Sequence, residues 1–189
     1  MSLSRAILYP VARRFFAGVK LEPALERMKE DNALGIGATV DFLGEDVENA
    51  SEAEMAKAEY RRAVEAIAFE ALDASVAIKL THIGLDISRI LTENNALEIA
   101  AAAKERGVFL WVDMEGSEHT DDTISIYRKL LSKGVPAGIA LQASLKRTWD
   151  DVKALTADGA RIRIVKGAYN EPPEIALQDK DAIRRVLSI

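Results

Sequence analysis

The chain has 189 residues, of which 49% are hydrophobic and 29% are charged, a mixture typical of one folded globular domain. Its net charge of −5 and its lack of clustered basic residues argue against a nucleic-acid surface. The absence of cysteine excludes disulfides and cysteine-ligated metals, and it is compatible with a cytoplasmic location. The longest uncharged runs are shorter than the roughly 18 apolar residues of a membrane-spanning helix.

The first predicted element is an amino-terminal helical arm, residues 1–34. Its basic residues Arg5, Arg13 and Arg14 are interspersed with apolar ones. This pattern is shared by a helix packed on a domain and by a membrane-surface or targeting segment. Pro10 interrupts the pattern and no small-residue cleavage site follows, so we favour a packed helix. The rest of the chain, residues 35–189, is expected to form one β/α domain.

Five short apolar runs rich in β-branched residues are typical of buried strands. They cover residues 36–43, 76–82, 108–114, 138–143 and 162–167. Helical patterns lie between them. Capping boxes, in which an acid follows a Ser or Thr by three residues, predict helix starts at Ser51 and Thr148, and Thr92 is expected to open a further helix. Helix ends are expected at three glycines, Gly107, Gly134 and Gly159.

Repeated strand-helix units predict the α/β class, with parallel strands joined by right-handed crossovers. A doubly wound sheet would normally carry a glycine-rich phosphate loop after its first strand. Gly35 and Gly37 instead lie at the start of that strand, and Val40 occupies the place of the third glycine. We therefore predict a partial (β/α)8 barrel of about five units, whose carboxyl-terminal units are missing because a full barrel takes about 250 residues.

Polar side chains end each predicted strand. They are Asp41; Lys79, Thr81 and His82; Asp113 and Glu115; Gln142; and Lys166 and Tyr169. The carboxyl ends of barrel strands meet at one rim, where active sites are built. The sequence therefore predicts a site at this rim. The alternative is a set of structural ion pairs at the mouth of the barrel.

Individual residues of this rim allow several roles. Lys79 is interpreted as a cation for a carboxylate, as a Schiff-base amine, or as the structural partner of Asp113. His82 is expected to be a hydrogen-bonded rim residue rather than a metal ligand, because no second His or Cys lies nearby. The acidic residues Glu115, Glu118, Asp121 and Asp122 are interpreted as favourable charges at a helix amino terminus rather than as a cation site.

Five ordered stretches at these strand ends carry a family resemblance. They are residues 37–45, 78–81, 112–118 (Val-Asp-Met-Glu-Gly-Ser-Glu), 141–143 and 161–169 with its Val-Lys-Gly-Ala-Tyr core, followed by Glu-Pro-Pro-Glu at 171–174. The chain thereby resembles the proline dehydrogenases, both the stand-alone enzymes and the matching domain of bifunctional proline-utilisation proteins. The resemblance implies FAD-dependent oxidation of L-proline to 1-pyrroline-5-carboxylate, with electrons passing to a quinone at the membrane surface and a location peripheral to the membrane.

The resemblance also implies roles for individual residues. Asp113 and Gln142 would be catalytic, and Lys79 would meet the substrate carboxylate. The residues expected to contact the flavin are Met114, Gln142, Arg163, Val165, Lys166, Gly167 and Ala168.

Two departures from the family pattern modify these expectations. Ser144 stands where the family commonly has an aromatic residue. The family also continues through three more strands, a Thr-His flavin contact and a helix with paired arginines, a role we do not assign to Arg184 and Arg185. We therefore expect this chain alone to bind flavin weakly and to show little activity. The alternatives are a non-catalytic fragment that associates with another chain, or with its own copies, through open sheet edges, and a lyase that forms a Schiff base on Lys79 or Lys166.

Overall fold

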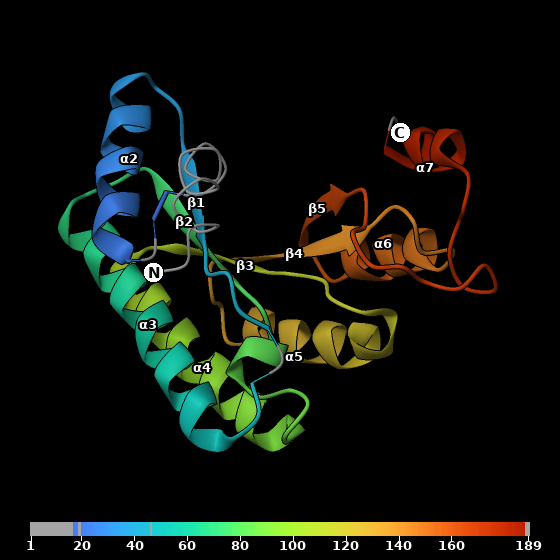
Figure 1. The fold of residues 1–189 in the computed structure, drawn as a ribbon, viewed down its shortest axis with the longest axis horizontal. Helices are drawn as coiled ribbons and strands as arrows, with labels where there is room; N and C mark the ends of the chain where they lie inside the picture. Colours follow the sequence, from blue (N-terminus) through green and yellow to red (C-terminus); the bar gives the residue numbers. More distant parts are fainter. Residues whose placement is uncertain (1–16, 19, 46, 188–189) are drawn as a thin grey trace, which may run out of the picture.

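The computed structural model describes residues 17–18, 20–45 and 47–187 (Figure 1). The helices are α2 (Leu21–Ala33), α3 (Ala50–Phe69), α4 (Arg89–Arg106), α5 (Thr120–Ser132), α6 (Thr148–Ala157) and α7 (Lys180–Leu187), with short 3-10 helices η1 (Thr81–Ile83) and η2 (Ser117–His119). The strands are β1 (Ala38–Asp41), β2 (Ala74–Ile78), β3 (Phe109–Val112), β4 (Ala137–Gln142) and β5 (Arg161–Val165).

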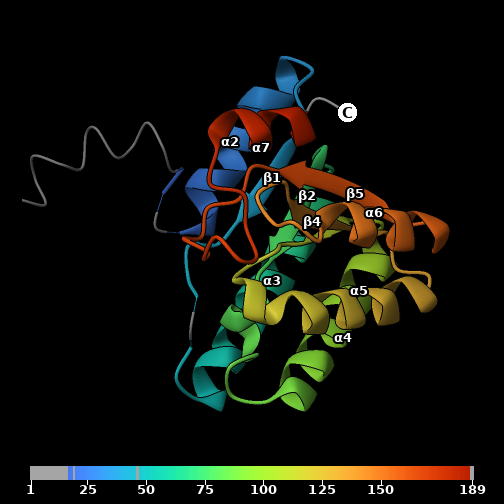
Figure 2. The ribbon, with the colours of Figure 1, turned by 90° about the vertical axis from the view of Figure 1, so that its right-hand side faces the viewer.

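The five strands form one parallel sheet in the order β1-β2-β3-β4-β5. A doubly wound sheet would reverse its strand order, whereas an uninterrupted order with right-handed crossovers places every crossover helix on the same face. Figure 2 shows α3, α4, α5 and α6 on one side of the strands. The predicted α/β class and the partial-barrel arrangement are therefore confirmed.

The strand register gives the sheet two different faces. The side chains on one face point toward the helices and are fully buried there, as at Val76, Leu110 and Ile139. The residues between them, which include Trp111 and Gly138, point to the other side. We call this second side the inner face, because it would face the interior of a closed barrel. The hydrophobic core therefore lies between the sheet and its helices.

The second strand ends earlier than the sequence predicts. It stops at Ile78, and the chain then turns into η1 instead of continuing to residue 82. The turn is held by a backbone bond from Ile83 to Leu80 and by the Asn95 amide, which donates to the Ile83 carbonyl at 3.0 Å. A local turn, supported by one side chain from the following helix, thus overrides the strand propensity of this segment.

The predicted helix starts are wrong in detail, although the helices exist. The cap of α3 is Asn49, whose side chain accepts from the Glu52 amide at 3.0 Å, so the capping box lies two residues before Ser51. The cap of α4 is Ser88, and Thr92 lies inside the helix. At α6 the Thr148 hydroxyl donates to a carbonyl at the end of β4 instead of capping.

The three predicted helix ends are confirmed. Gly107, Gly134 and Gly159 have φ values of 69°, 67° and 75°, in the left-handed region that favours glycine. Each follows its helix by one or two residues.

The predicted amino-terminal arm falls only partly within the described residues. Its basic segment with Arg5, Arg13 and Arg14 lies outside them. Helix α2 packs against β1 and α3, and the Asn32 side chain hydrogen-bonds to the backbone of Asp73 before β2. The boundary between an arm (1–34) and a barrel part (35–189) stays a prediction. Within the described ranges, no helix has the length and apolar character that crossing a membrane requires.

Candidate functional site

A cavity of about 690 Å³ opens at the carboxyl end of the sheet, and we call it the strand-tip cavity. Its volume is within the range of small-molecule sites. All nine residues to which the family resemblance assigned a role line it, namely Lys79, Asp113, Met114, Gln142, Arg163, Val165, Lys166, Gly167 and Ala168. Of the other polar residues predicted at the rim, Glu115 and Tyr169 also line it, whereas Asp41, Thr81 and His82 do not. They come from the ends of β2, β3, β4 and β5, so the parallel sheet itself brings them together.

Lys79 follows β2 directly and is held by the neighbouring strand. Its ammonium group donates to Asp41 at the end of β1 and to the Phe42 carbonyl at 3.3 Å. The interpretation of Asp113 as its structural partner is therefore wrong, since Asp41 takes that place. The Lys79 side chain is only 12% exposed. A second carboxylate that enters the cavity would meet a cation whose position is already fixed.

Asp113 follows β3 and pairs with Arg163 across the sheet. The Arg163 Nη2 atom donates to the Asp113 Oδ1 atom at 2.6 Å. Burial raises the pKa of the Asp113 carboxyl, while the Arg163 guanidinium acts in the opposite direction. This pair supports both interpretations of the rim charges, because a structural ion pair here also forms part of the cavity wall.

Glu115 is a buried carboxylate rather than a solvated charge at a helix terminus. It is 2% exposed and accepts from the backbone N–H of Thr81 at 3.0 Å and from the Thr81 hydroxyl at 2.5 Å. Burial raises its pKa, and the hydrogen bonds from Thr81 partly oppose this rise. The interpretation of Glu115 as one of four helix-terminus acids is therefore wrong.

Gln142 ends β4 and is held by the loop that carries Glu115. Its amide nitrogen donates to the Glu115 carbonyl at 2.6 Å. Its amide oxygen is buried and has no hydrogen-bond partner. One end of this amide is therefore fixed by the protein, and the other has no partner among the described residues.

Gly167 lies beside this amide oxygen. Its φ is 100°, and a Cβ atom at this position would fall 2.9 Å from the Gln142 oxygen and closer still to the Ser144 hydroxyl. Packing inside the protein therefore requires glycine here, quite apart from any ligand. The Ser144 hydroxyl is also buried without a partner.

Buried side-chain atoms without a partner are concentrated at this site. Among the described residues there are five, and three belong to Gln142, Ser144 and Arg163. Unpaired buried polar atoms cost free energy, so they commonly mark a place where a ligand or water binds. The unpaired groups are an amide oxygen, a hydroxyl and a guanidinium N–H. Together they match a ligand whose edge both donates and accepts hydrogen bonds.

Two further hydrogen bonds lie near the cavity. His82 accepts or donates at Nδ1 with the Tyr60 hydroxyl at 3.1 Å, which confirms it as a hydrogen-bonded rim residue. Burial, followed by the nearby Lys79 charge, lowers the pKa of His82. Tyr169, after β5, reaches Glu45, after β1, at 3.3 Å, so the loops of the two outermost strands meet.

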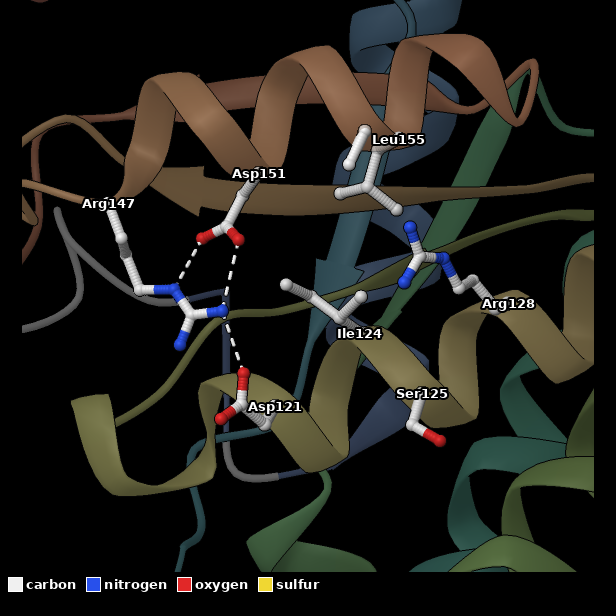
Figure 3. A pocket seen from close by; sticks show the side chains of 8 residues that line it. Asp121, Ile124, Ser125, Arg128, Arg147, Asp151 and Leu155 are labelled. Carbon is white, nitrogen blue, oxygen red and sulfur yellow. Dashed lines mark hydrogen bonds and ion pairs between the residues drawn. The ribbon is translucent and has the colours of Figure 1, made fainter.

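A smaller cavity of about 240 Å³ lies between α5 and α6 (Figure 3). Arg147 spans it and pairs with Asp121 at 2.7 Å and with Asp151 at 2.7 Å. Ile124 and Leu155 form the apolar part of its wall. Since the Arg147 charge is already paired from both helices, this feature is an interhelical brace, and the strand-tip cavity remains the candidate site.

The fold and the site together define a partial β/α barrel with a cavity at the carboxyl ends of its strands, where proteins of this architecture bind their ligands. A family model described as "Proline dehydrogenase" matches residues 24–184. The chain belongs to the proline dehydrogenase family.

Curated relatives agree with this assignment. The chain is 37% identical over 169 residues to proline dehydrogenase 1 of Bacillus subtilis (strain 168), which covers 89% of the chain and 56% of the relative. It is 32% identical over 183 residues to the proline dehydrogenase of Deinococcus radiodurans, covering 94% of the chain and 59% of the relative. The chain thus spans somewhat more than half the length of the relatives it matches.

Solved structures show the same fold. Proline utilization A from Bdellovibrio bacteriovorus, inactivated by N-propargylglycine, aligns with a TM-score of 0.77 at 22% identity, over 88% of this chain and 21% of that one. Proline utilization A from Corynebacterium freiburgense aligns with a TM-score of 0.68 at 23% identity, over 86% and 19%. At this level of identity the likeness concerns the fold.

Sequence reasoning missed several residues of the site. Glu45 and Ala140 line the cavity but were assigned no role, and Glu115 was assigned the wrong one. Glu45 could have been found from its position in the loop that follows the first strand, directly after Gly44. Trp111, which contacts Arg163 without lining the cavity, was also assigned no role, because a tryptophan inside a strand is usually a core residue.

Proposed function

We propose that this chain forms the flavin- and substrate-binding wall of an FAD-dependent proline dehydrogenase, which oxidises L-proline to 1-pyrroline-5-carboxylate. The observation that carries the proposal is the gathering of nine family-matched residues around one cavity, together with the family membership of the chain. The relatives named proline dehydrogenase support the substrate. The lyase and the non-catalytic fragment are not favoured by these comparisons.

The residues present fit a flavin. Gln142 offers an unpartnered acceptor, Arg163 offers an unpartnered N–H, and Gly167 presents bare backbone to the cavity. When bound, FAD would supply the redox chemistry, taking a hydride from the ring carbon next to the proline nitrogen while that nitrogen loses its proton. We assign Met114, Val165, Lys166 and Ala168, with these three residues, to holding it.

The chain's own groups bind and orient the substrate. Lys79, fixed by Asp41, is the cation that attracts the proline carboxylate. Asp113 is proposed as the acidic residue that helps to hold the substrate, because it lines the same cavity as Lys79. Gln142, anchored on the Glu115 carbonyl, keeps an uncharged amide beside the electron-accepting ring and completes the catalytic set.

The electron acceptor and the location follow from this proposal. Electrons would pass from the reduced cofactor to a quinone at the membrane surface, which requires a peripheral and cytoplasmic position for the protein. We also propose that open strands β1 and β5, each paired on one side only among the described residues, allow association with another chain.

The experiment is a flavin titration and a dye-reduction assay with L-proline on the purified 189-residue chain, with the Bacillus subtilis proline dehydrogenase 1 as positive control. We expect weak FAD binding and turnover far below the control, because the cavity wall comes from five strands only. Arg163→Met should weaken FAD binding further, whereas Lys79→Met should raise KM for proline and leave FAD binding unchanged. No FAD binding at any concentration would contradict the proposal, and full occupancy with normal turnover would contradict the expected weakness.

A further inference from the structure

The inner face carries an arrangement of aromatic and basic side chains below the strand-tip cavity. Trp111 on β3 and Arg163 on β5 are separated by β4, which contributes only Gly138 and Ala140 to this part of the face. Because these two residues are so small, side chains from β3 and β5 meet above them. The Arg163 Cζ atom lies 4.8 Å from the centre of the Trp111 ring.

The Trp111 ring rests directly on Gly138. A Cβ atom at residue 138 would fall 2.7 Å from the Cε3 atom of the indole, a distance that real Cβ atoms essentially never show. The backbone of Gly138 has no left-handed φ, so glycine is required here for space and not for conformation. The ring is thus seated on backbone, and the Arg163 guanidinium lies over the same ring.

Arg163 is held at two points. One hydrogen bond from Nη2 to Asp113 fixes the end of the guanidinium, and the ring of Trp111 lies against its Cζ atom. A single hydrogen bond leaves the group free to rotate, whereas stacking on an aromatic face fixes the orientation of a planar cation. The Nε–H of Arg163 is buried and has no partner, so its direction depends on this support.

A second pair on the same face provides a comparison. The Arg161 Cζ atom lies 5.3 Å from the centre of the Phe109 ring, one step further from the cavity. Arg161 is exposed to solvent and does not line the cavity. The same type of contact therefore occurs once beside the cavity and once away from it. The Phe109 ring also packs edge-on against Trp111, with ring centroids 5.1 Å apart, so Phe109→Leu serves as a graded control for Trp111→Leu.

We propose that Trp111, seated on Gly138, is a positioning residue that orients the Arg163 guanidinium toward the flavin. The inference rests on the proposed function for the identity of the ligand, but the orientation of Arg163 is a property of the chain without ligand. Trp111 acts through Arg163 and is not itself a catalytic residue.

The first test uses the chain without flavin. The NMR signal of the Arg163 Nε–H, assigned by its loss in Arg163→Lys, should exchange slowly with solvent in the unmodified chain. Trp111→Leu should speed this exchange about tenfold, a change that corresponds to roughly 1.4 kcal/mol and is within the range of desolvated cation–π contacts. Trp111→Phe should have a smaller effect, and Phe109→Leu, which removes only the edge contact to Trp111, should have the smallest effect on the Arg163 signal.

The second test measures the FAD dissociation constant and the reduction potential of the bound flavin in the same variants. Trp111→Leu should raise the dissociation constant about fivefold and shift the potential, while Phe109→Leu should change both much less. Gly138→Ala, which displaces the indole while keeping it present, should act in the same direction as Trp111→Leu. If Trp111→Leu does not fold, Trp111→Phe and Gly138→Ala carry the comparison.

The outcomes separate the two proposals. If the unmodified chain binds no FAD, the proposed function fails, while the exchange of the Arg163 N–H still tests Trp111. If Trp111→Leu and Gly138→Ala leave that exchange and the FAD affinity as they were, the inference on Trp111 is overturned and the proposed function stands. An equal effect of Phe109→Leu would also overturn it, because it would show a loss of general packing.

Discussion

The two faces of the sheet are built by alternate residues of the same strands, yet they follow different rules. On the helix side of β3 and β4, Leu110 and Ile139 are fully buried among aliphatic neighbours. On the inner face, at adjacent positions of the same two strands, stand Trp111 and Gly138, and the strand tips beyond them carry charges and amides. Stability and binding are therefore divided between the two faces of each strand.

This division explains why polar atoms without partners are tolerated. Gln142 and Arg163 each keep one buried atom unpaired on the inner face. The free energy that this costs is offset by the aliphatic packing of the helix side, which involves none of the same side chains. A change on one face should therefore alter stability, and a change on the other should alter binding.

The largest effect is expected from breaking the helix side. Leu110→Ala removes a fully buried side chain from the central strand and leaves a cavity among Val76 and its neighbours. We expect a loss of about 3 kcal/mol in the free energy of unfolding, measured by urea denaturation. Thr39→Ala on the exposed inner face of β1 is the control, with a cost of about 0.5 kcal/mol or less. Equal losses at both positions would refute the division of the two faces.

An intermediate effect, visible in its pH dependence, is expected at Glu115. Its pKa is raised above the ordinary value of 4.5 because the carboxyl is buried. The folded chain then holds this proton more tightly than the unfolded chain does. Stability should fall as the pH rises from about this ordinary value through the raised pKa, and it should level off above that.

Glu115→Gln removes this titration while keeping an acceptor for the Thr81 backbone N–H. Urea denaturation over a pH series should show that the unmodified chain loses stability relative to the variant as the pH rises. Asp113 has a pKa shifted in the same direction, but it is present in both proteins and cancels from the difference. A constant difference between the two proteins at every pH would contradict a buried, titrating Glu115.

The gathering of the site residues was predictable from the sequence. Lys79, Asp113 and Gln142 each follow an apolar run, and a parallel sheet brings the residues after such runs to one rim. The right class and the right rim therefore follow from periodicity and order alone. The family resemblance then added Arg163, which lies inside a strand rather than after one.

The partners of these residues were not predictable. Lys79 pairs with Asp41 rather than with Asp113, because the register of β1 against β2 decides which strand tips are neighbours. Glu115 is buried because the chain turns at Thr81 and directs an N–H and a hydroxyl at it. Such choices depend on strand register and on turns fixed by distant residues, which leave no mark in a local pattern.

The smallest effect concerns the start of α3, where a local pattern had two matches. The sequence favours Ser51 with Glu54, but the structure uses Asn49, whose side chain accepts from the Glu52 amide, while the Glu52 carboxylate accepts from the Glu48 amide at 2.8 Å. Asn49→Ala should therefore cost about 1 kcal/mol of unfolding free energy, and Ser51→Ala should be close to neutral. Both are measured by urea denaturation under the same conditions. Because this cap belongs to the helix layer, FAD affinity should be the same in both variants. A larger loss of stability for Ser51→Ala than for Asn49→Ala would contradict Asn49 as the cap and support the helix start that the sequence favours.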